Sequence, residues 1–496
     1  MPQVTPAGVS GQSKEPRGAG PPGGSSCDGS TTQRRGAKVR SRATLKHSAG
    51  SFSRQGDPVH RALGTDLARP YSLRWLSGSR LVAREPLCYA AMARRETADL
   101  VVVGAGTIGG WAAWFAATSG ARRVVVLERD LAGQGASSRA AGIVRAQGGA
   151  PATVALGRFS IDFYRKQASL IGTDSGFREL GYLILSVTAR DEREARTRVA
   201  MQRKAGLNVR VVDAAAACRL NPTLARRGHR GGSYCPTDGA IDPSRNVRAY
   251  SLAMQQAGVD LRERTPFLGL RSVPSRGRRR RVTGVLTPDG VIATERVILT
   301  GGPTLRAVGR LVGARLFAGG ARHQVVVTEP HPDFEVPRQP MVFDVGAGIY
   351  WRLEEGGLLW GMSNPREAPG PAREVDWPYL RRMERRLQQL VPSTRGLGIR
   401  RAWAATIDYT PDHLPILGPV VTRRGVTLEG TTLASAGGHG MMWGPGVARV
   451  AADLALEGRS GLIDASALGM DRFDAQGRSP FFDPIALPFP PSADQD

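Results

Sequence analysis

The stretch "ADLVVVGAGTIGGWAAWFAATSGARRVVVLERD", residues 98–130, sets the architecture of this chain. An apolar run, Val101–Val103, leads into a glycine-rich turn, a stretch of small residues that ends at Gly120, and a second apolar run, "RRVVVLE". Short β-branched runs on either side of a helical segment are typical of a βαβ unit with parallel strands. The stretch therefore predicts an α/β fold.

The turn between the first strand and the helix has the spacing of a dinucleotide-binding fingerprint. Gly104, Gly106 and Gly109 form GxGxxG. The first glycine permits the tight turn, the second lets a pyrophosphate approach the backbone, and the third lets the helix pack on the strand. Glu128 ends the second strand, where a carboxylate accepts both ribose hydroxyls of the nucleotide and repels the additional phosphate of NADP.

The residues after Glu128 favour FAD over NAD. A Gly- and Ser-rich loop, Gly133–Ser138, stands where an NAD-binding domain usually proceeds to its next strand. Near the other end, "GGHGMMWGP", residues 437–445, precedes a helix that "GPGVARVAADLALEG" predicts up to Gly458. The N-terminus of a helix attracts an anion. The reduced flavin is such an anion, whereas NAD would place none there.

From residue 97 to about 473 the chain resembles the D-amino-acid oxidase-type (DAO) superfamily of flavoproteins, in the branch of sarcosine oxidase and dimethylglycine dehydrogenase. The motifs that carry the resemblance follow the order of the family: "GAGTIGG", "VVVLER", "GQGASSRAAGIVR", "CPTDGAIDPSRNVRAY", "VTGVLTPDG", "RVILTGGP", "HQVVVTEP", "TPDHLPILGP", "GGHGMMWGPGVARVAADLALEG" and "DASALGMDRF". The resemblance implies FAD as the cofactor. It also implies a discontinuous, Rossmann-like FAD-binding domain of the glutathione-reductase type, with an inserted α+β substrate domain built on a β-sheet.

The resemblance and the composition together divide the chain. We expect an FAD-binding domain over residues 97–180, 241–312 and 405–473, a substrate domain over 181–240 and 313–404, and a C-terminal tail over 474–496. Residues 1–91 are rich in Gly, Pro, Ser and Arg, and we expect them to be disordered because they cannot bury enough apolar surface. We expect translation to begin at Met92 and the protein to be cytoplasmic. The alternative is that residues 1–91 form a transit peptide to an organelle matrix.

The resemblance implies a reaction at a carbon–nitrogen bond. A C–H bond next to nitrogen in a secondary or tertiary amine, or in an amino acid, gives a hydride to flavin N5 and leaves an imine. Two alternatives stay open: oxidation of a 2-hydroxy acid, and an FAD-binding assembly factor without turnover. The electron acceptor is O₂ or another molecule. The lysine that activates oxygen in the oxidases has no counterpart, because no lysine follows Lys204, and Arg322 and His323 are the nearest basic candidates.

Two residues predict that FAD is bound without a covalent link. Ala405 stands where several sarcosine oxidases attach FAD to a cysteine, and Arg139 stands where dimethylglycine dehydrogenase-like proteins use a histidine.

The motifs predict which residues form the site. The resemblance implies that Arg145 binds a substrate carboxylate, although it could instead brace FAD. Met442 replaces the lysine that completes this clamp, which favours an amine larger or more apolar than sarcosine. His439 is a candidate for contact with flavin or substrate, or a structural residue. Tyr350 is a candidate on the covering face, where it could contribute to an aromatic cage around an amine and where ordinary sheet core is the alternative. His323 is a candidate as the basic residue in place of the oxygen-activating lysine. The predicted cofactor-binding residues are Gly104, Gly106, Thr107, Ile108, Gly109, Glu128, Arg129, Ser137, Ser138, Phe267, Gly301, Gly302, Gly438, Gly440, Met441 and Met442.

Composition limits the other functions. The chain has 496 residues, a formal charge of +25 and only five lysines among its 68 basic residues, a bias that weakens charge as an argument about partners. The densest basic run, "RGRRRR" at 276–281, has no aromatic residues to stack on bases. We interpret it as a loop between two strands and expect no binding of nucleic acid. The four cysteines lack metal-ligand spacing, and no run of 18 apolar residues exists, so we expect no metal site and no membrane span.

Overall fold

The computed structural model describes residues 96–483 and 485, except 368–369 and 372–373. The predicted disorder of residues 1–91 and the predicted start at Met92 lie outside the described residues. None of the helices that the structure describes combines the length and the hydrophobicity that crossing a bilayer requires.

A ten-stranded sheet contains the fingerprint. Its order is β1-β13-β12-β21-β14-β2-β3-β10, with β11 paired to β12 and β20 paired to β21. Five neighbouring strands, from β21 to β10, are parallel. The strands are β1 (Glu96–Thr97), β2 (Leu100–Val103), β3 (Val124–Leu127), β10 (Asp260–Arg262), β11 (Gly269–Pro274), β12 (Arg279–Thr287), β13 (Gly290–Ala293), β14 (Val297–Leu299), β20 (Ile416–Val421) and β21 (Thr427–Ser435). Neighbours so distant in sequence make this part of the fold discontinuous, as predicted.

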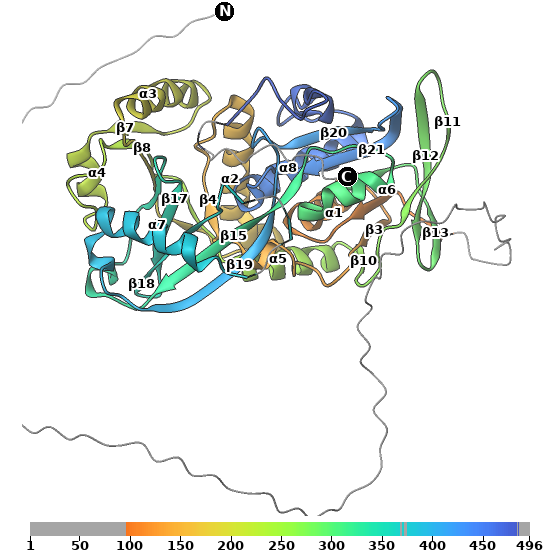
Figure 1. Ribbon diagram of the computed structural model, residues 1–496. Helices are drawn as coiled ribbons and strands as arrows, with labels where there is room; N and C mark the ends of the chain where they lie inside the picture. Colours follow the sequence, from red (N-terminus) through yellow and green to blue (C-terminus); the bar gives the residue numbers. More distant parts are fainter. Residues whose placement is uncertain (1–95, 368–369, 372–373, 484, 486–496) are drawn as a thin grey trace, which may run out of the picture. The chain divides into compact units, whose positions relative to one another are not determined.

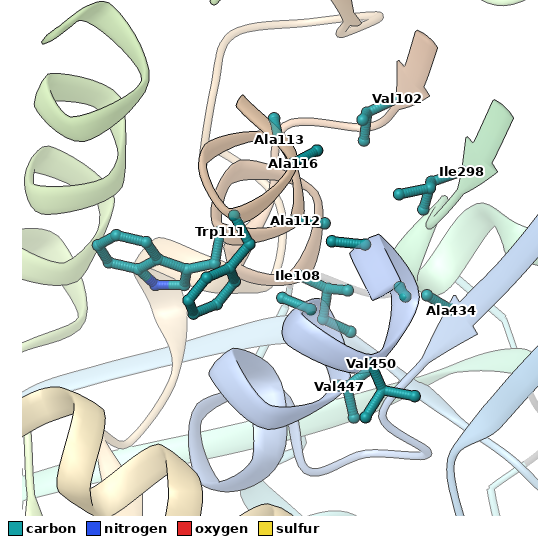
Figure 2. Packing of buried hydrophobic residues seen from close by; sticks show 14 of the residues in the cluster. Val102, Ile108, Trp111, Ala112, Ala113, Ala116, Ile298, Ala434, Val447 and Val450 are labelled. Atoms are coloured by element: carbon teal, nitrogen blue, oxygen red, sulfur yellow. The ribbon is translucent and has the colours of Figure 1, made fainter. Parts of the chain in front are cut away.

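Helices cover both faces of the parallel strands. Val102, Ile298 and Ala434, on three adjacent strands, face the buried sides of α1 and α8 (Figure 2). The alternate residues Val101, Val103 and Leu299 belong to a second cluster with α6. This alternation is the period of two that a strand buried on both faces requires. The helices of this region are α1 (Thr107–Thr118), α2 (Pro151–Ile171), α5 (Pro243–Gln256), α6 (Leu305–Leu311) and α8 (Gly440–Glu457).

An eight-stranded sheet forms the second part of the fold, with the order β19-β15-β18-β17-β16-β6-β8-β7. Its strands are β6 (Tyr182–Leu185), β7 (Arg210–Val212), β8 (Gly232–Cys235), β15 (Gly319–Thr328), β16 (Met341–Asp344), β17 (Ile349–Glu354), β18 (Gly357–Met362) and β19 (Ile399–Tyr409). Figure 1 shows α3 (Ala189–Lys204), α4 (Ala214–Leu220) and α7 (Trp377–Leu390) around these strands. A short sheet of β4 (Ile143–Val144), β9 (Gly239–Ala240) and β5 (Arg178–Glu179) lies in neither large sheet.

The two faces of the eight-stranded sheet differ in what they cover. Val326, Val342 and Trp351 point to the face that Leu380, Met383, Leu387 and Leu390 of α7 bury. Their neighbours Val325, Phe343 and Tyr350 point to the opposite face, which packs against Ala141, Ile143 and Met442. This second face therefore meets the glycine-rich loop region and the start of α8. We call it the site face.

The structure corrects one local expectation. Arg279–Arg281, predicted as part of a solvated loop, open β12 and pair in parallel with Thr427–Glu429 of β21. Only Ser275–Arg278 connect β11 and β12. The exact boundaries of the two domains stay a prediction; the proposed division at 404/405 falls within β19.

Candidate active site

The fingerprint forms a closed turn between β2 and α1. Gly104 has a φ of +97°, in the region that favours glycine. A Cβ on Gly109 would lie 1.8 Å from the carbonyl oxygen of Gly104, so only glycine lets α1 approach the strand this closely. Gly106, the N-cap residue of α1, has no side chain that could cap the helix, and none of the first-turn residues is acidic. Apart from the Thr107 N–H, which donates to Ser137, the positive end of this helix therefore remains available to an anion. The predicted residues Gly106, Thr107 and Ile108 lie in this same turn and first helical turn.

Glu128 lies where the fingerprint predicts it. Its carboxylate accepts the backbone N–H groups of Ala105 at 2.8 Å and Asp130 at 2.9 Å. These bonds hold the carboxylate beside the glycine-rich turn while its remaining lone pairs can accept ligand hydroxyls. Arg129 points away, with a side chain that is 61% exposed and pairs with Asp130 at 3.0 Å.

The loop after Glu128 folds back onto the start of α1. The Ser137 hydroxyl oxygen accepts the Thr107 N–H at 2.9 Å, and Asn246 donates to the Thr107 hydroxyl at 3.1 Å. Ser138 lies in the short 3₁₀ turn Ser137–Arg139. The predicted residues Gly301 and Gly302 follow β14 with positive φ values, and Thr300 donates to the Val103 carbonyl at 2.7 Å. They thus lie at the same end of the parallel strands as the fingerprint turn. Phe267 is buried in the cluster that contains Val103 and Leu127.

The start of α8 has no side-chain cap from its N-cap residue. Gly438 has a φ of +96°, and His439 precedes Gly440, the first helical residue. Within the described part of the chain, no side chain caps this helix and its first turn contains no acid. His439 stacks on Trp443 with ring centroids 4.1 Å apart. Burial lowers its pKa well below the ordinary value, and the charge of Arg145 adds to this effect, so the imidazole is neutral at neutral pH.

Arg145 lies in a buried polar cluster beside β4. It is 3% exposed, and its guanidinium donates to the carbonyl of Gln147. Gln147 donates to Asp238 at 3.0 Å and accepts the Ser233 hydroxyl at 2.8 Å. Burial raises the pKa of Asp238 to about 6, an effect that the Ala146 N–H, Gln147 and Arg145 oppose.

His323 and Tyr350 form a pair on the site face. His323 Nε2 and the Tyr350 hydroxyl are 2.7 Å apart, and the Ser363 hydroxyl lies 2.9 Å from His323 Nδ1. Burial lowers the pKa of His323 to about 4 and raises that of Tyr350, so both groups are neutral at neutral pH. Arg322, the adjacent residue on β15, pairs with Glu367 at 2.9 Å. Because His323 is neutral at neutral pH, it supplies no fixed positive charge for activating oxygen.

Sequence reasoning missed part of this site. Gln147, Asp238 and Ser233 are buried polar residues that only the fold brings together. The available signal was Gln147 in "RAQGG" and Asp238 in "TDGA", two polar side chains that stand among small residues.

A cleft of about 1130 Å³ also reaches the loop at 133–139, and its lining includes Ser138, Ala140, Arg352 and Trp403. Trp403 donates to the Arg139 carbonyl at 2.9 Å, a contact that fixes the loop. The described residues contain no group of three or more His, Cys, Asp or Glu that could hold a metal ion.

Known proteins resemble this chain over most of the described residues. 4-Methylaminobutanoate oxidase (formaldehyde-forming) of Paenarthrobacter nicotinovorans is 27% identical over 75% of this chain and 45% of its own length. Glycine oxidase of Geobacillus kaustophilus is 27% identical over 75% of this chain and 97% of its own length. The crystal structure of L-proline dehydrogenase from P. horikoshii shares the fold, with a TM-score of 0.68, 24% identity, and coverage of 76% of this chain and 98% of that one.

The chain spans less than half the length of the first curated relatives that it matches. A family profile, "FAD dependent oxidoreductase" (DAO), matches residues 99–454. The match includes the fingerprint, the start of α8 and every strand of the two large sheets except β1, and it confirms the predicted fold class and cofactor. The chain belongs to the DAO family of FAD dependent oxidoreductases.

Proposed function

We propose that this protein oxidises a secondary or tertiary amine, or an amino acid, at the C–H bond next to nitrogen. The observation that carries the proposal is the neutral His323–Tyr350 pair, which lies on the face that packs against Ile143 and Met442. Relatives whose names describe oxidation of methylaminobutanoate and glycine support this class of substrate. The shared chemistry of these names is a carboxylate and an amine on one small molecule.

The residues present fit FAD. Glu128 would accept the ribose hydroxyls at the adenosine end, and the starts of α1 and α8, whose N-cap residues make no side-chain cap, would hold the pyrophosphate and the pyrimidine end of the flavin. The chemistry that FAD supplies when bound is acceptance of a hydride from the carbon next to the substrate nitrogen, which leaves an imine. We expect the cofactor to be non-covalent because Ala405 is a buried methyl side chain and the Arg139 guanidinium binds the Gly135 carbonyl at 3.2 Å.

The site face has two tasks in this reaction. An amine must be neutral before its lone pair can assist loss of the hydride, and a neutral hydrogen-bonding pair imposes no charge that would hold the amine protonated. The Tyr350 hydroxyl and His323 Nε2 form such a pair. The surrounding Ile143, Phe343 and Leu359 are nearly inaccessible to solvent, so they exclude water from the reacting atoms.

Arg145 provides the positive charge that we propose binds a substrate carboxylate. A guanidinium held by the Gln147 carbonyl retains further N–H groups that can donate to a substrate carboxylate. The Ser233–Gln147–Asp238 chain fixes the segment that carries this arginine. We therefore assign Arg145 to carboxylate binding and the His323–Tyr350 pair to the amine.

The experiment follows the flavin colour. The purified full chain is denatured with acid to release flavin, and the native protein is mixed without oxygen with amines, amino acids and 2-hydroxy acids, one at a time. We expect yellow protein, flavin in the acid supernatant, and bleaching by members of the amine class alone. Readmission of air then separates an oxidase, whose colour returns, from a dehydrogenase that needs an added acceptor.

Three results would contradict the proposal in different ways. A colourless protein that cannot be reconstituted with FAD would show that the proposed cofactor is wrong. Bleaching by 2-hydroxy acids alone would show that the substrate belongs to that class and not to the amines. Stable bound FAD that no compound of either class reduces indicates a binding factor without turnover.

A further inference from the structure

A second buried arginine lies near Arg145. Arg198, on α3, is 8% exposed, and it shares the buried side of that helix with Gln202, one turn further on. Gln202 donates to the Gly148 carbonyl at 2.8 Å. The buried side of α3 therefore lies against the segment that begins at Arg145.

The C-terminal segment brings a carboxylate to the same place. Asp483 is fully buried; its N–H donates to the Asp412 carbonyl at 3.0 Å, and one carboxylate oxygen accepts the Ile485 N–H at 2.9 Å. Ile485 packs in the same cluster as Tyr182 and Tyr350. Residues predicted as a tail thus reach the site face.

The charges of Arg198, Asp483 and Arg145 interact, yet Arg198 and Asp483 each keep one polar atom without a hydrogen bond among the described residues. Burial lowers the pKa of Arg198, the Asp483 carboxylate opposes this shift, and the charge of Arg145 adds to it. Within the described residues, Nε of Arg198 and the second carboxylate oxygen of Asp483 have no hydrogen-bond partner. A buried guanidinium or carboxylate is costly without full pairing. Unpaired atoms of this kind indicate a ligand or an ordered water.

A ligand carboxylate explains the arrangement better than a structural ion pair. A structural pair would bring Arg198 and Asp483 into direct contact, whereas no such bond accounts for these two atoms in the part of the chain described.

We propose that Arg198 binds the substrate carboxylate together with Arg145, and that Asp483 is the counter-charge that keeps this affinity moderate. The proposal rests on the proposed function and narrows its substrate to amines that carry a carboxylate. Asp238 is the neighbouring carboxylate that faces Arg145, and its oxygens are already engaged by the Ala146 N–H and Gln147.

The test uses carboxylate binding, which requires no turnover. The flavin-containing full chain is titrated with butyrate and with butyramide, and binding is followed by the change in the visible flavin spectrum and by calorimetry. We expect butyrate to bind and butyramide not to bind. Arg198→Gln should raise the Kd of butyrate about tenfold or more, since a charge-assisted hydrogen bond is lost. Arg198→Lys should restore part of the affinity, and Asp483→Asn should lower the Kd several-fold.

The matched control is Arg196→Gln. Arg196 lies on the same helix, but its side chain is 63% exposed and pairs with Glu192 at 2.9 Å. This variant removes the same charge from the protein and should leave the Kd within about twofold. Unchanged binding in Arg198→Gln, or an equal effect in both variants, would overturn the proposal.

Two further measurements separate the causes of failure. Circular dichroism and flavin content show whether Arg198→Gln folds; if it does not, Arg198→Lys and Asp483→Asn still decide the outcome, since unchanged affinity in both overturns the proposal. With a substrate that bleaches the flavin, Arg198→Gln should raise KM far more than it lowers kcat. If no amine bleaches the wild-type flavin, the proposed function has failed, whatever the butyrate titration shows.

Discussion

His323 and Asp238 show how burial changes the ionisation of single residues. In the folded protein the pKa of His323 is about 4 against an ordinary 6.5, and that of Asp238 is about 6 against 3.8; burial is the main cause in both cases. Burial disfavours the charged form of each group. Because one group is a base and the other an acid, the two shifts have opposite consequences for stability.

The sign follows from proton counting. Between about pH 4 and 6.5 the unfolded chain binds more protons at His323 than the folded protein, so stability from this residue rises with pH. Between about pH 3.8 and 6 the folded protein binds more protons at Asp238, so stability from that residue falls as pH rises. The two contributions partly cancel in the wild-type protein.

Single variants should separate the contributions of His323 and Asp238 to the pH dependence of the free energy of unfolding. We expect the free energy of unfolding of wild-type protein relative to His323→Gln to rise by on the order of 3 kcal/mol across the His323 window, from 1.36 kcal/mol per pKa unit. Relative to Asp238→Asn it should change in the opposite direction. Urea unfolding at several pH values measures both. Differences of the same sign in the two variants would show that burial does not govern these groups.

At the scale of elements, the close packing of α1 on β2 depends on one missing side chain. A Cβ on Gly109 would lie 1.8 Å from one backbone oxygen and 3.0 Å from the attached carbon, both of Gly104. Backbone cannot move aside as a flexible side chain can. Gly109→Ala should therefore push α1 away from the strand and distort the fingerprint turn.

We expect Gly109→Ala to lose bound FAD and to cost about 3 kcal/mol of stability or more, as overpacking does. Flavin content after gel filtration and urea unfolding measure the two effects. The control is Gly461→Ala, because the corresponding Cβ meets nothing within 4 Å. If both variants retain FAD equally, the close approach of helix and strand is not what shapes the turn.

Elements with a local period could be predicted from sequence, and those decided by distant partners could not. The βαβ unit with Glu128, and the end of α8 at Gly458, follow from short-range patterns. Arg279–Arg281 were not predicted as a strand, because a run of arginines lacks the apolar alternation of a strand; they pair with Thr427–Glu429 far along the chain and, at Arg280 and Arg281, with the end of β11. Likewise, no local pattern distinguishes Arg198 from the other charged residues of α3, and only the fold buries it.

The whole molecule gathers its candidate cofactor site from segments that are distant in sequence. The fingerprint turn at 104–109, the loop at 133–139, the glycines after β14 and the start of α8 belong to different parts of the ten-stranded sheet and its helices. A ligand that binds all of them stabilises the folded state of the entire assembly of segments. Binding to the folded state alone adds about 2.7 kcal/mol when the free ligand is at 100 times its Kd.

Protein stripped of flavin should therefore melt at a lower temperature, and added FAD should raise its Tm as the FAD concentration increases. FMN should raise it far less, because it lacks the ribose hydroxyls that we propose Glu128 binds and the pyrophosphate that we propose the start of α1 binds. Differential scanning calorimetry with matched concentrations of the two flavins measures the difference. Glu128→Ala should bring the FAD response close to that of FMN. Equal stabilisation by FAD and FMN would mean that the adenosine end contributes nothing, and the assignment of Glu128 would then be wrong.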